Sequence, residues 1–199
     1  MRSTKSRPYR MHRRAEQVGE TRLRITEAAV RLHTTVGPSQ TSIAAVAEGA
    51  GVTRLTVYRH FADLDALFIA CRAHWLALDP PPDASRWPAI PGFEERTRLG
   101  LTELYAWYRA RGDELYPIYR DATSLPLTTQ AARREENRQL GDALVAGFAA
   151  PDDHGRRLTA VARHLADLGT WRSPVLHGLS DGEAGDLAVR PPTAVPPAS

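Results

Sequence analysis

The segment GVTRLTVYRHFADLDALF, residues 51–68, combines a turn, a short helix and the start of another helix. Gly51 ends a preceding apolar pattern, and Thr53 can cap a helix that turns Val57 and Phe61 toward a core. The remaining side chains of this helix have little core to join: Arg54, Leu55, Thr56, Tyr58, Arg59 and His60. The segment therefore predicts a short helix that presents a hydrogen-bonding surface to a partner.

The residues around this segment predict further helices. Apolar residues recur at helical spacing from Ile25 to Val36, and Gly37 followed by Pro38 stops that pattern. Thr41 or Ser42 can cap a second helix that ends at Gly51, and Asp63 can cap a fourth. Two short helices joined by a tight turn at residues 51–53 are typical of a helix-turn-helix.

A helix-turn-helix suits recognition of DNA, because the major groove admits one helix whose first residues reach the base edges. Arginine can donate two hydrogen bonds to guanine, and threonine or leucine methyl groups can contact a thymine methyl. Tyrosine and histidine can donate hydrogen bonds to phosphates. The sequence thus predicts a recognition helix over residues 53–61.

Residues 21–70 resemble the DNA-binding domain of the tetracycline-repressor (TetR) family. The resemblance rests on Ile25-x-x-Ala28-Ala29-x-x-Leu32, Gly37, Thr41-Ser42-Ile43-x-x-Val46-Ala47-x-x-Ala50-Gly51-Val52, and Thr56-Val57-Tyr58-Arg59-His60-Phe61 with Ala66-Leu67. It implies an all-α fold, with a three-helix DNA-binding domain followed by a helical ligand-binding and dimerisation domain. By position it implies base contacts from Arg54, Leu55, Thr56 and Arg59, and phosphate contacts from Thr41, Ser42, Thr53, Tyr58 and His60.

The resemblance also implies a function: a homodimeric repressor that a small-molecule ligand releases from a palindromic operator in double-stranded DNA. Ligand binding would change the spacing of two recognition helices, which must match about one DNA turn, roughly 34–36 Å. The alternatives within regulation are an activator and a regulator whose ligand promotes DNA binding. A protein-binding module with a degenerate helix-turn-helix is a further alternative. An enzyme is the alternative of another class, but the sequence offers no paired acid and base, phosphate loop or metal cluster, and no cofactor is expected.

Positive charge gathers at the N-terminus. The formal net charge is +3, but residues 1–24 hold eight Lys or Arg and only two Glu. Residues 1–18 have little apolar content and are expected to form a basic disordered tail. Arg7, Arg10, Arg13 and Arg14 of this tail can reach the DNA backbone or minor groove. Many family members have Lys where this chain has Leu64, so the tail could replace a phosphate contact. The alternative is a solvated tail without a partner.

The rest of the chain predicts a second domain. Prolines at residues 80–91 mark a connector, and the expected domains are residues 19–66 and 67–190, with a Pro-rich tail at 191–199. Tyr105, Tyr108 and Tyr119 are predicted to line a ligand pocket, with ordinary core packing as the alternative. The stripe Leu158, Val161, Ala162 and Leu165 is predicted to be a dimer interface, with intrachain core as the alternative.

Other signals are weaker. The pattern Gly178-x-Ser180-x-Gly182 matches a hydrolase motif, but no strand precedes it and no histidine follows, so a capping box of Ser180 and Glu183 explains it better. The seven histidines lack zinc-like spacing, and no metal is predicted. Cys71 is expected to be a buried hydrophobe, with a redox thiol as the alternative. One cysteine and no long apolar run indicate a cytoplasmic protein outside the membrane.

Overall fold

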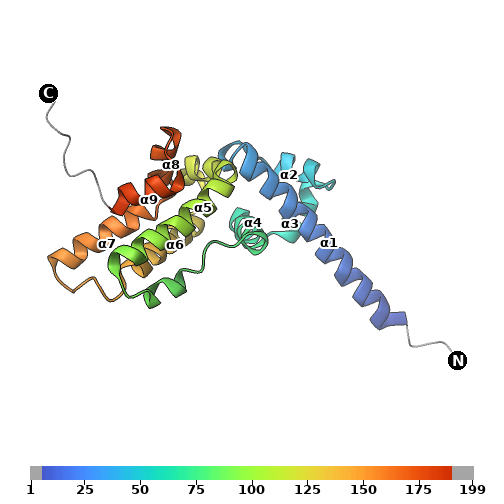
Figure 1. Ribbon diagram of the computed structural model, residues 1–199. Helices are drawn as coiled ribbons and strands as arrows, with labels where there is room; N and C mark the ends of the chain where they lie inside the picture. Colours follow the sequence, from blue (N-terminus) through green and yellow to red (C-terminus); the bar gives the residue numbers. More distant parts are fainter. Residues whose placement is uncertain (1–5, 190–199) are drawn as a thin grey trace, which may run out of the picture. The chain divides into compact units, whose positions relative to one another are not determined.

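The computed structural model describes residues 6–189, and that part of the chain is helical without a strand (Figure 1). This agrees with the all-α prediction. The α-helices are α1 (Ser6–Thr35), α2 (Ile43–Gly49), α3 (Arg54–His60), α4 (Leu64–Leu78), α5 (Phe93–Arg120), α6 (Leu127–Val145), α7 (Asp153–Leu165), α8 (Leu168–Leu176) and α9 (Asp181–Val189). Three short 3-10 helices connect them: η1 (Pro38–Gln40), η2 (Ala84–Ala89) and η3 (Ala122–Ser124).

The chain forms two compact units whose boundary differs from the expected one. The first unit contains residues 1–79 and 116–129, and the second contains residues 80–115 and 130–199. The expected boundary at residue 66 falls inside α4, where Leu67 and Cys71 are both buried in the core of the first unit. A helix whose apolar face is needed by that core belongs to the first unit along its whole length.

The core of the first unit is built by the predicted apolar stripes. In this unit α1 packs against α2 and α4, and α2 packs against α3. The buried core residues come from all four helices and from the residues that directly follow α2 and α3: Ile25, Ala28, Ala29, Val46, Ala47, Ala50, Val57, Phe61, Leu67 and Cys71. His33 joins them by stacking on Phe68, with ring centroids 4.4 Å apart and planes 2° from parallel. Val36, at the end of the predicted α1 stripe, is instead 45% exposed.

The first unit is closed by a segment distant in sequence. Asp121 is 8% exposed, and its Oδ2 accepts hydrogen bonds from Ser39 N at 3.0 Å and Ser39 Oγ at 2.6 Å. The guanidinium of Arg120 pairs with the same carboxylate at 2.8 Å and donates to the Val36 carbonyl at 2.8 Å. These bonds hold the pKa of Asp121 well below its usual range. They fix the turn that follows α1.

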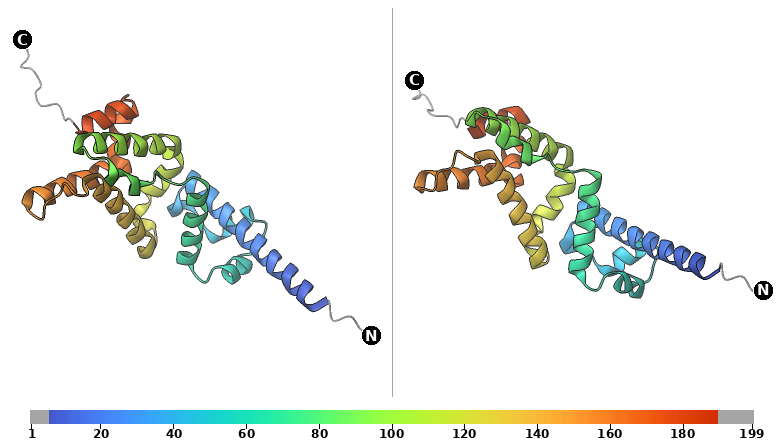
Figure 2. Two further views of the ribbon diagram at one scale, coloured as in Figure 1. Left: turned by 60° about the horizontal axis from the view of Figure 1, so that its bottom comes forward. Right: turned by 90° about the horizontal axis from the view of Figure 1, so that it is seen from below.

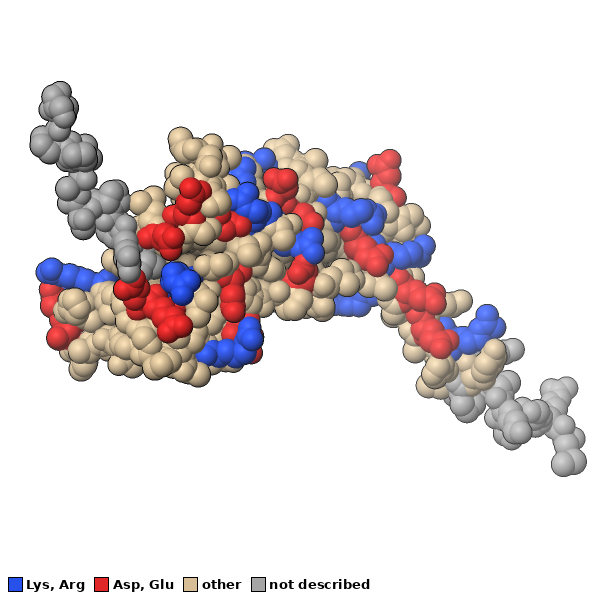
Figure 3. All heavy atoms as spheres, viewed as in Figure 1, with Lys and Arg blue, Asp and Glu red and all other residues tan. Residues whose placement is uncertain are grey.

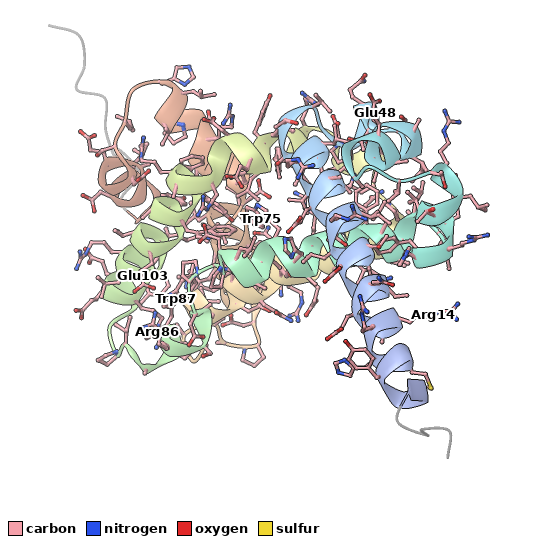
Figure 4. The ribbon with its side chains drawn as sticks, turned by 90° about the vertical axis from the view of Figure 1, so that its right-hand side faces the viewer. Arg14, Glu48, Trp75, Arg86, Trp87 and Glu103 are labelled. Carbon is pink, nitrogen blue, oxygen red and sulfur yellow. The ribbon has the colours of Figure 1, made fainter. Side chains whose placement is uncertain are left out.

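In the second unit, α9 lies beside α5, as the views in Figures 1 and 2 agree. Asp181 joins these helices to α8, because its carboxylate accepts from Arg109 Nε at 2.7 Å and from Trp171 Nε1 at 2.9 Å. The Pro-rich connector is also anchored: Trp87 of η2 is 2% exposed and donates to Glu103 Oε2 at 3.0 Å. Figure 4 shows Trp87 and Glu103 next to each other, with Arg86 beside them.

The N-terminal region differs from the disorder expected over residues 1–18, because α1 already begins at Ser6. A helix that is nucleated by packing extends at low cost, since each further residue adds one hydrogen bond. Along this extension, His12 Nδ1 lies 3.1 Å from Glu16 Oε1, and the Arg13 guanidinium lies 5.8 Å from the centroid of the Tyr9 ring. The Pro-rich segment at 191–199 lies outside the described residues.

Candidate nucleic-acid interface

The turn between α2 and α3 is fixed by a cap and a glycine. Ser42, one of the two predicted caps, begins α2 with its Oγ accepting from Ala45 N at 3.1 Å. Gly51 has φ of 65°, in the left-handed region that favours glycine. This turn lets the next residue donate its N–H to the Ala47 carbonyl at 2.9 Å. The sequence prediction of a helix-turn-helix is therefore confirmed in its details.

The second helix of this motif, α3, buries one side and exposes the other. Thr53 is the N-cap as predicted, accepting from Thr56 N at 3.2 Å. Val57 and Phe61 are 1% and 2% exposed and attach the helix to the core. The opposite side carries the exposed residues Arg54, Leu55, Tyr58 and Arg59. Because 60% of Leu55 and 56% of Tyr58 are exposed, the face is unpartnered within the first unit despite being partly apolar.

The other residues predicted to contact DNA are half-buried or already form hydrogen bonds within the chain. The hydroxyls of Thr53 and Thr56 lie 2.9 Å apart and share a hydrogen bond, and His60 is half-buried. Thr41 Oγ1 donates to the Gly37 carbonyl at 2.9 Å, while Ser42 remains exposed although its hydroxyl serves as the cap. A phosphate oxygen accepts hydrogen bonds, so Thr41 would have to give up its bond to the Gly37 carbonyl to contact one. The Ser42 hydroxyl accepts from Ala45 N and keeps its own proton for such a contact. Their roles toward DNA stay predictions.

Two arginines that the sequence analysis did not single out hold this motif to α1. Arg31 Nη2 donates to the Gly49 carbonyl at the end of α2 at 3.2 Å. Arg22 Nη1 donates to the His60 carbonyl at the end of α3, and its guanidinium lies 4.1 Å from the centroid of the Phe61 ring. A cation at a helix C-terminus is favourable, because it meets the unpaired carbonyls there.

The predicted arm is the N-terminal part of α1. Arg13 and Arg14 are exposed on it, and Arg14 extends from the helix in Figure 4. The side chains of Arg7 and Arg10 lie outside the described residues. Acidic side chains also lie along the face of α1 seen in Figure 3, and Glu16 and Glu20 belong to this stretch. The arm therefore carries both signs of charge with an excess of arginine.

Two of the three tyrosines predicted to bind a ligand donate hydrogen bonds to backbone carbonyls of the chain itself. Tyr105 and Tyr108 are buried, and their hydroxyls donate to the Leu165 and Ala166 carbonyls at 2.9 and 2.7 Å. Burial raises the pKa of both phenols above the ordinary value. Tyr119 belongs to the first unit, whereas Tyr105 and Tyr108 belong to the second.

The predicted dimer stripe on α7 has two different sides. Ala162 is buried, Leu158 and Leu165 are half-buried, and Val161 is 53% exposed. Asp142 of α6 accepts from Arg163 of α7 at 2.8 Å, next to Gly141, where a Cβ would clash with the Arg163 backbone. One side of α7 thus packs closely on α6, and Val161 belongs to the other side.

The capping box and the buried cysteine are both present as predicted. Ser180 and Glu183 form the expected capping box, with Ser180 N donating to Glu183 Oε2 at 2.8 Å and Glu183 N donating to Ser180 Oγ at 3.3 Å. Cys71 is buried, and burial raises the pKa of its thiol to about 12. Among residues 6–189, no group of three or more His, Cys, Asp or Glu side chains could hold a metal ion. In the same range, none of the helices has the length and apolar character to cross a bilayer.

This geometry defines the first unit as a helix-turn-helix domain of the DNA-binding type. Residues 25–71 match the family described as bacterial regulatory proteins, tetR family. It is similar to the HTH-type transcriptional regulator AcrR of Shigella flexneri, with 44% identity over 53 residues. That similarity covers 27% of this chain and 25% of the relative, so the chain matches only about a quarter of the relative's length.

Proposed function

We propose that this protein binds DNA through α3 and regulates transcription from the sites that it recognises. The observation that carries the proposal is the exposed face of α3, which combines two arginines with Leu55 and Tyr58 while both ends of the helix are fixed. Arg54 lies in the first turn, where side chains of a recognition helix reach base edges. Arg54, Leu55, Thr56 and Arg59 would face bases.

The phosphate contacts would come from residues around that face: Thr41, Ser42, Thr53, Tyr58 and His60. The arm would add sequence-independent attraction through Arg13, Arg14 and the further arginines Arg7 and Arg10. Because α1 is one helix from Ser6 to Thr35, the arm would approach DNA as a semi-rigid rod rather than as a flexible tail.

The finer function that we propose is a homodimeric repressor that a small molecule releases from a palindromic operator. The proposed dimer face is the stripe Leu158, Val161, Ala162 and Leu165. The exposed Val161 supports a second copy on α7, and the half-buried Leu158 and Leu165 would add their exposed parts, whereas Ala162 is buried within the chain. Tyr105, Tyr108 and Tyr119 are the proposed effector contacts, although the hydroxyls of the first two already bond to carbonyls. An activator or a co-repressed regulator would use the same DNA surface.

The deciding experiment is selection of random duplex DNA by the full chain, read by sequencing. Enrichment of a palindrome with half-sites about one turn apart supports a sequence-specific dimer. Arg54→Ala should then cost roughly 1–3 kcal/mol of binding free energy and relax one operator position. Arg13→Ala is the matched control, because it removes the same charge from the arm and should weaken all sequences alike. No enrichment would contradict the proposal, and turnover of a substrate would favour the enzyme alternative.

A further inference from the structure

The recognition helix depends on its surroundings for its position. α3 has seven residues, about two turns, and a helix of that length is unstable by itself in water. Its start is fixed by the Thr53 cap, and its inner side is fixed by Val57 and Phe61. The carbonyls of its last turn need a further partner, because a helix end leaves them without one.

Arg22 supplies that partner from a different helix. It lies 38 residues from His60 in sequence, and it donates to the His60 carbonyl while its guanidinium covers the Phe61 ring at 4.1 Å. Phe61 is the first residue after α3 and has extended backbone angles of φ −133° and ψ 116°. One side chain of α1 thus contacts both the last helical residue and the residue at which the chain leaves the helix.

We propose that Arg22 is a positioning residue for DNA recognition, which sets the orientation of α3 without itself reading bases. This proposal rests on the DNA-binding function proposed above. The loss of Arg22 leaves Thr53 and Val57 in place, so α3 stays attached to the core but can tilt about its N-terminal half. A small tilt moves Arg54 and Arg59 relative to the base edges, and direct readout depends on that geometry.

The chemistry of the contact requires arginine in particular. A guanidinium is planar, so it can lie against an aromatic ring and still direct an N–H in its plane to a carbonyl. A lysine ammonium at the same place keeps the charge but has no flat face to stack. The substitution Arg22→Lys therefore separates positioning from simple electrostatic attraction to DNA.

The contact also joins the arm to the recognition helix. Arg14 lies eight residues before Arg22 in α1, about two helical turns away. Because α1 is continuous between them, Arg22 fixes the base of the arm and the end of α3 to each other. The arm, which would contact DNA of any sequence, and α3, which would contact bases, are then kept at a fixed distance and orientation to each other.

The first test compares affinity for a selected duplex with affinity for an unrelated duplex of equal length, at about 0.15 M salt. Arg22→Lys and Arg22→Ala should each lower the ratio of these affinities by roughly tenfold. Arg24→Ala is the matched control: Arg24 is exposed, lies two residues away and points to a different side of α1. It should weaken both duplexes alike and leave the ratio unchanged. A wild-type ratio in Arg22→Lys would overturn the proposal.

The second test needs no DNA. Hydrogen exchange of the amides in α3, including the Phe61 N–H that donates to Val57 at 2.9 Å, should be about fivefold faster or more in both Arg22 variants. Exchange in the buried part of α4 should stay as in the wild type, which excludes general unfolding. Unchanged α3 exchange would refute the positioning role even if the protein binds DNA. A wild-type protein that selects no DNA would instead refute the proposed function, whatever the exchange result.

Discussion

Acid should destabilise the first unit through His33, a histidine that its fold keeps neutral. Burial lowers the pKa of His33 from its ordinary value of 6.5 to about 4. His33 is 5% exposed, and its ring stacks on Phe68. Between these two pKa values the unfolded chain binds a proton that the folded chain does not, so stability falls as the pH falls through that window. Above about pH 6.5 the full contribution is present.

The magnitude follows from the two pKa values. At about pH 5 an unfolded His33 is almost fully protonated and a folded one is about one-tenth protonated, which costs about 2 kcal/mol relative to pH 7. Urea unfolding at both pH values measures this change as a difference in the free energy of unfolding. The chain has other ionisable groups, including six more histidines, so a reference variant is required.

His33→Phe is that reference, because a phenyl ring has a similar shape for stacking on Phe68 and takes up no proton. The other titrating groups are common to both proteins and cancel in the comparison. The stability of the wild type relative to His33→Phe should therefore drop by about 2 kcal/mol from pH 7 to pH 5. A difference that stays constant over this range would refute the assignment of a buried neutral imidazole.

Two further predictions concern the backbone and the thiol of the first unit. Gly51→Ala should cost about 1 kcal/mol of unfolding free energy, because φ is 65° but the space around a Cβ is open. Gly37→Ala should cost at least about 2 kcal/mol more, since φ is 96° and a Cβ would clash with the Asp121 carboxylate; equal losses in thermal or urea unfolding would contradict this. Cys71 should react with iodoacetamide at about pH 8 roughly a thousandfold more slowly in the folded protein than in urea, because burial raises its thiol pKa to about 12. Similar rates by mass spectrometry would show that the thiol is accessible.

The sequence was sufficient for features that depend on near neighbours. Apolar spacing located the helices around the turn, and the caps at Ser42, Thr53 and Asp63 each bond within three residues, as the predictions required. The capping box at Ser180 is local in the same sense. Such features can be predicted from the sequence because the residues of the motif also form its hydrogen bonds.

Features made by distant residues could not be read in this way. Nothing in the chain near Arg22 indicates that its guanidinium ends on the His60 carbonyl, and the apolar residues around Tyr105 fit a ligand pocket as well as a core. The structure shows the Tyr105 hydroxyl bonded to a carbonyl 60 residues away. A buried tyrosine hydroxyl needs a hydrogen-bond partner whether it lies in a ligand pocket or in a core. The composition of the sequence and its helical spacing therefore do not show whether that partner is a ligand or a backbone carbonyl.

The division into two units shows the same limit at a larger scale. The chain passes between the units after residues 79, 115 and 129, and the last two passages lie within α5 and α6. Domain boundaries are predicted from polar or Pro-rich linkers, and only the first of these three passages has such a linker. The other two lie inside helices, where the helical sequence pattern continues without a break.

The contribution of residues 116–129 to the first unit is nevertheless specific, since Asp121 accepts two hydrogen bonds from Ser39, 82 residues earlier. A fragment that ends at Asp79 keeps the whole helix-turn-helix but removes the carboxylate that fixes the turn after α1. The unit that contains the helix-turn-helix is therefore defined by its contacts and not by one continuous stretch of sequence.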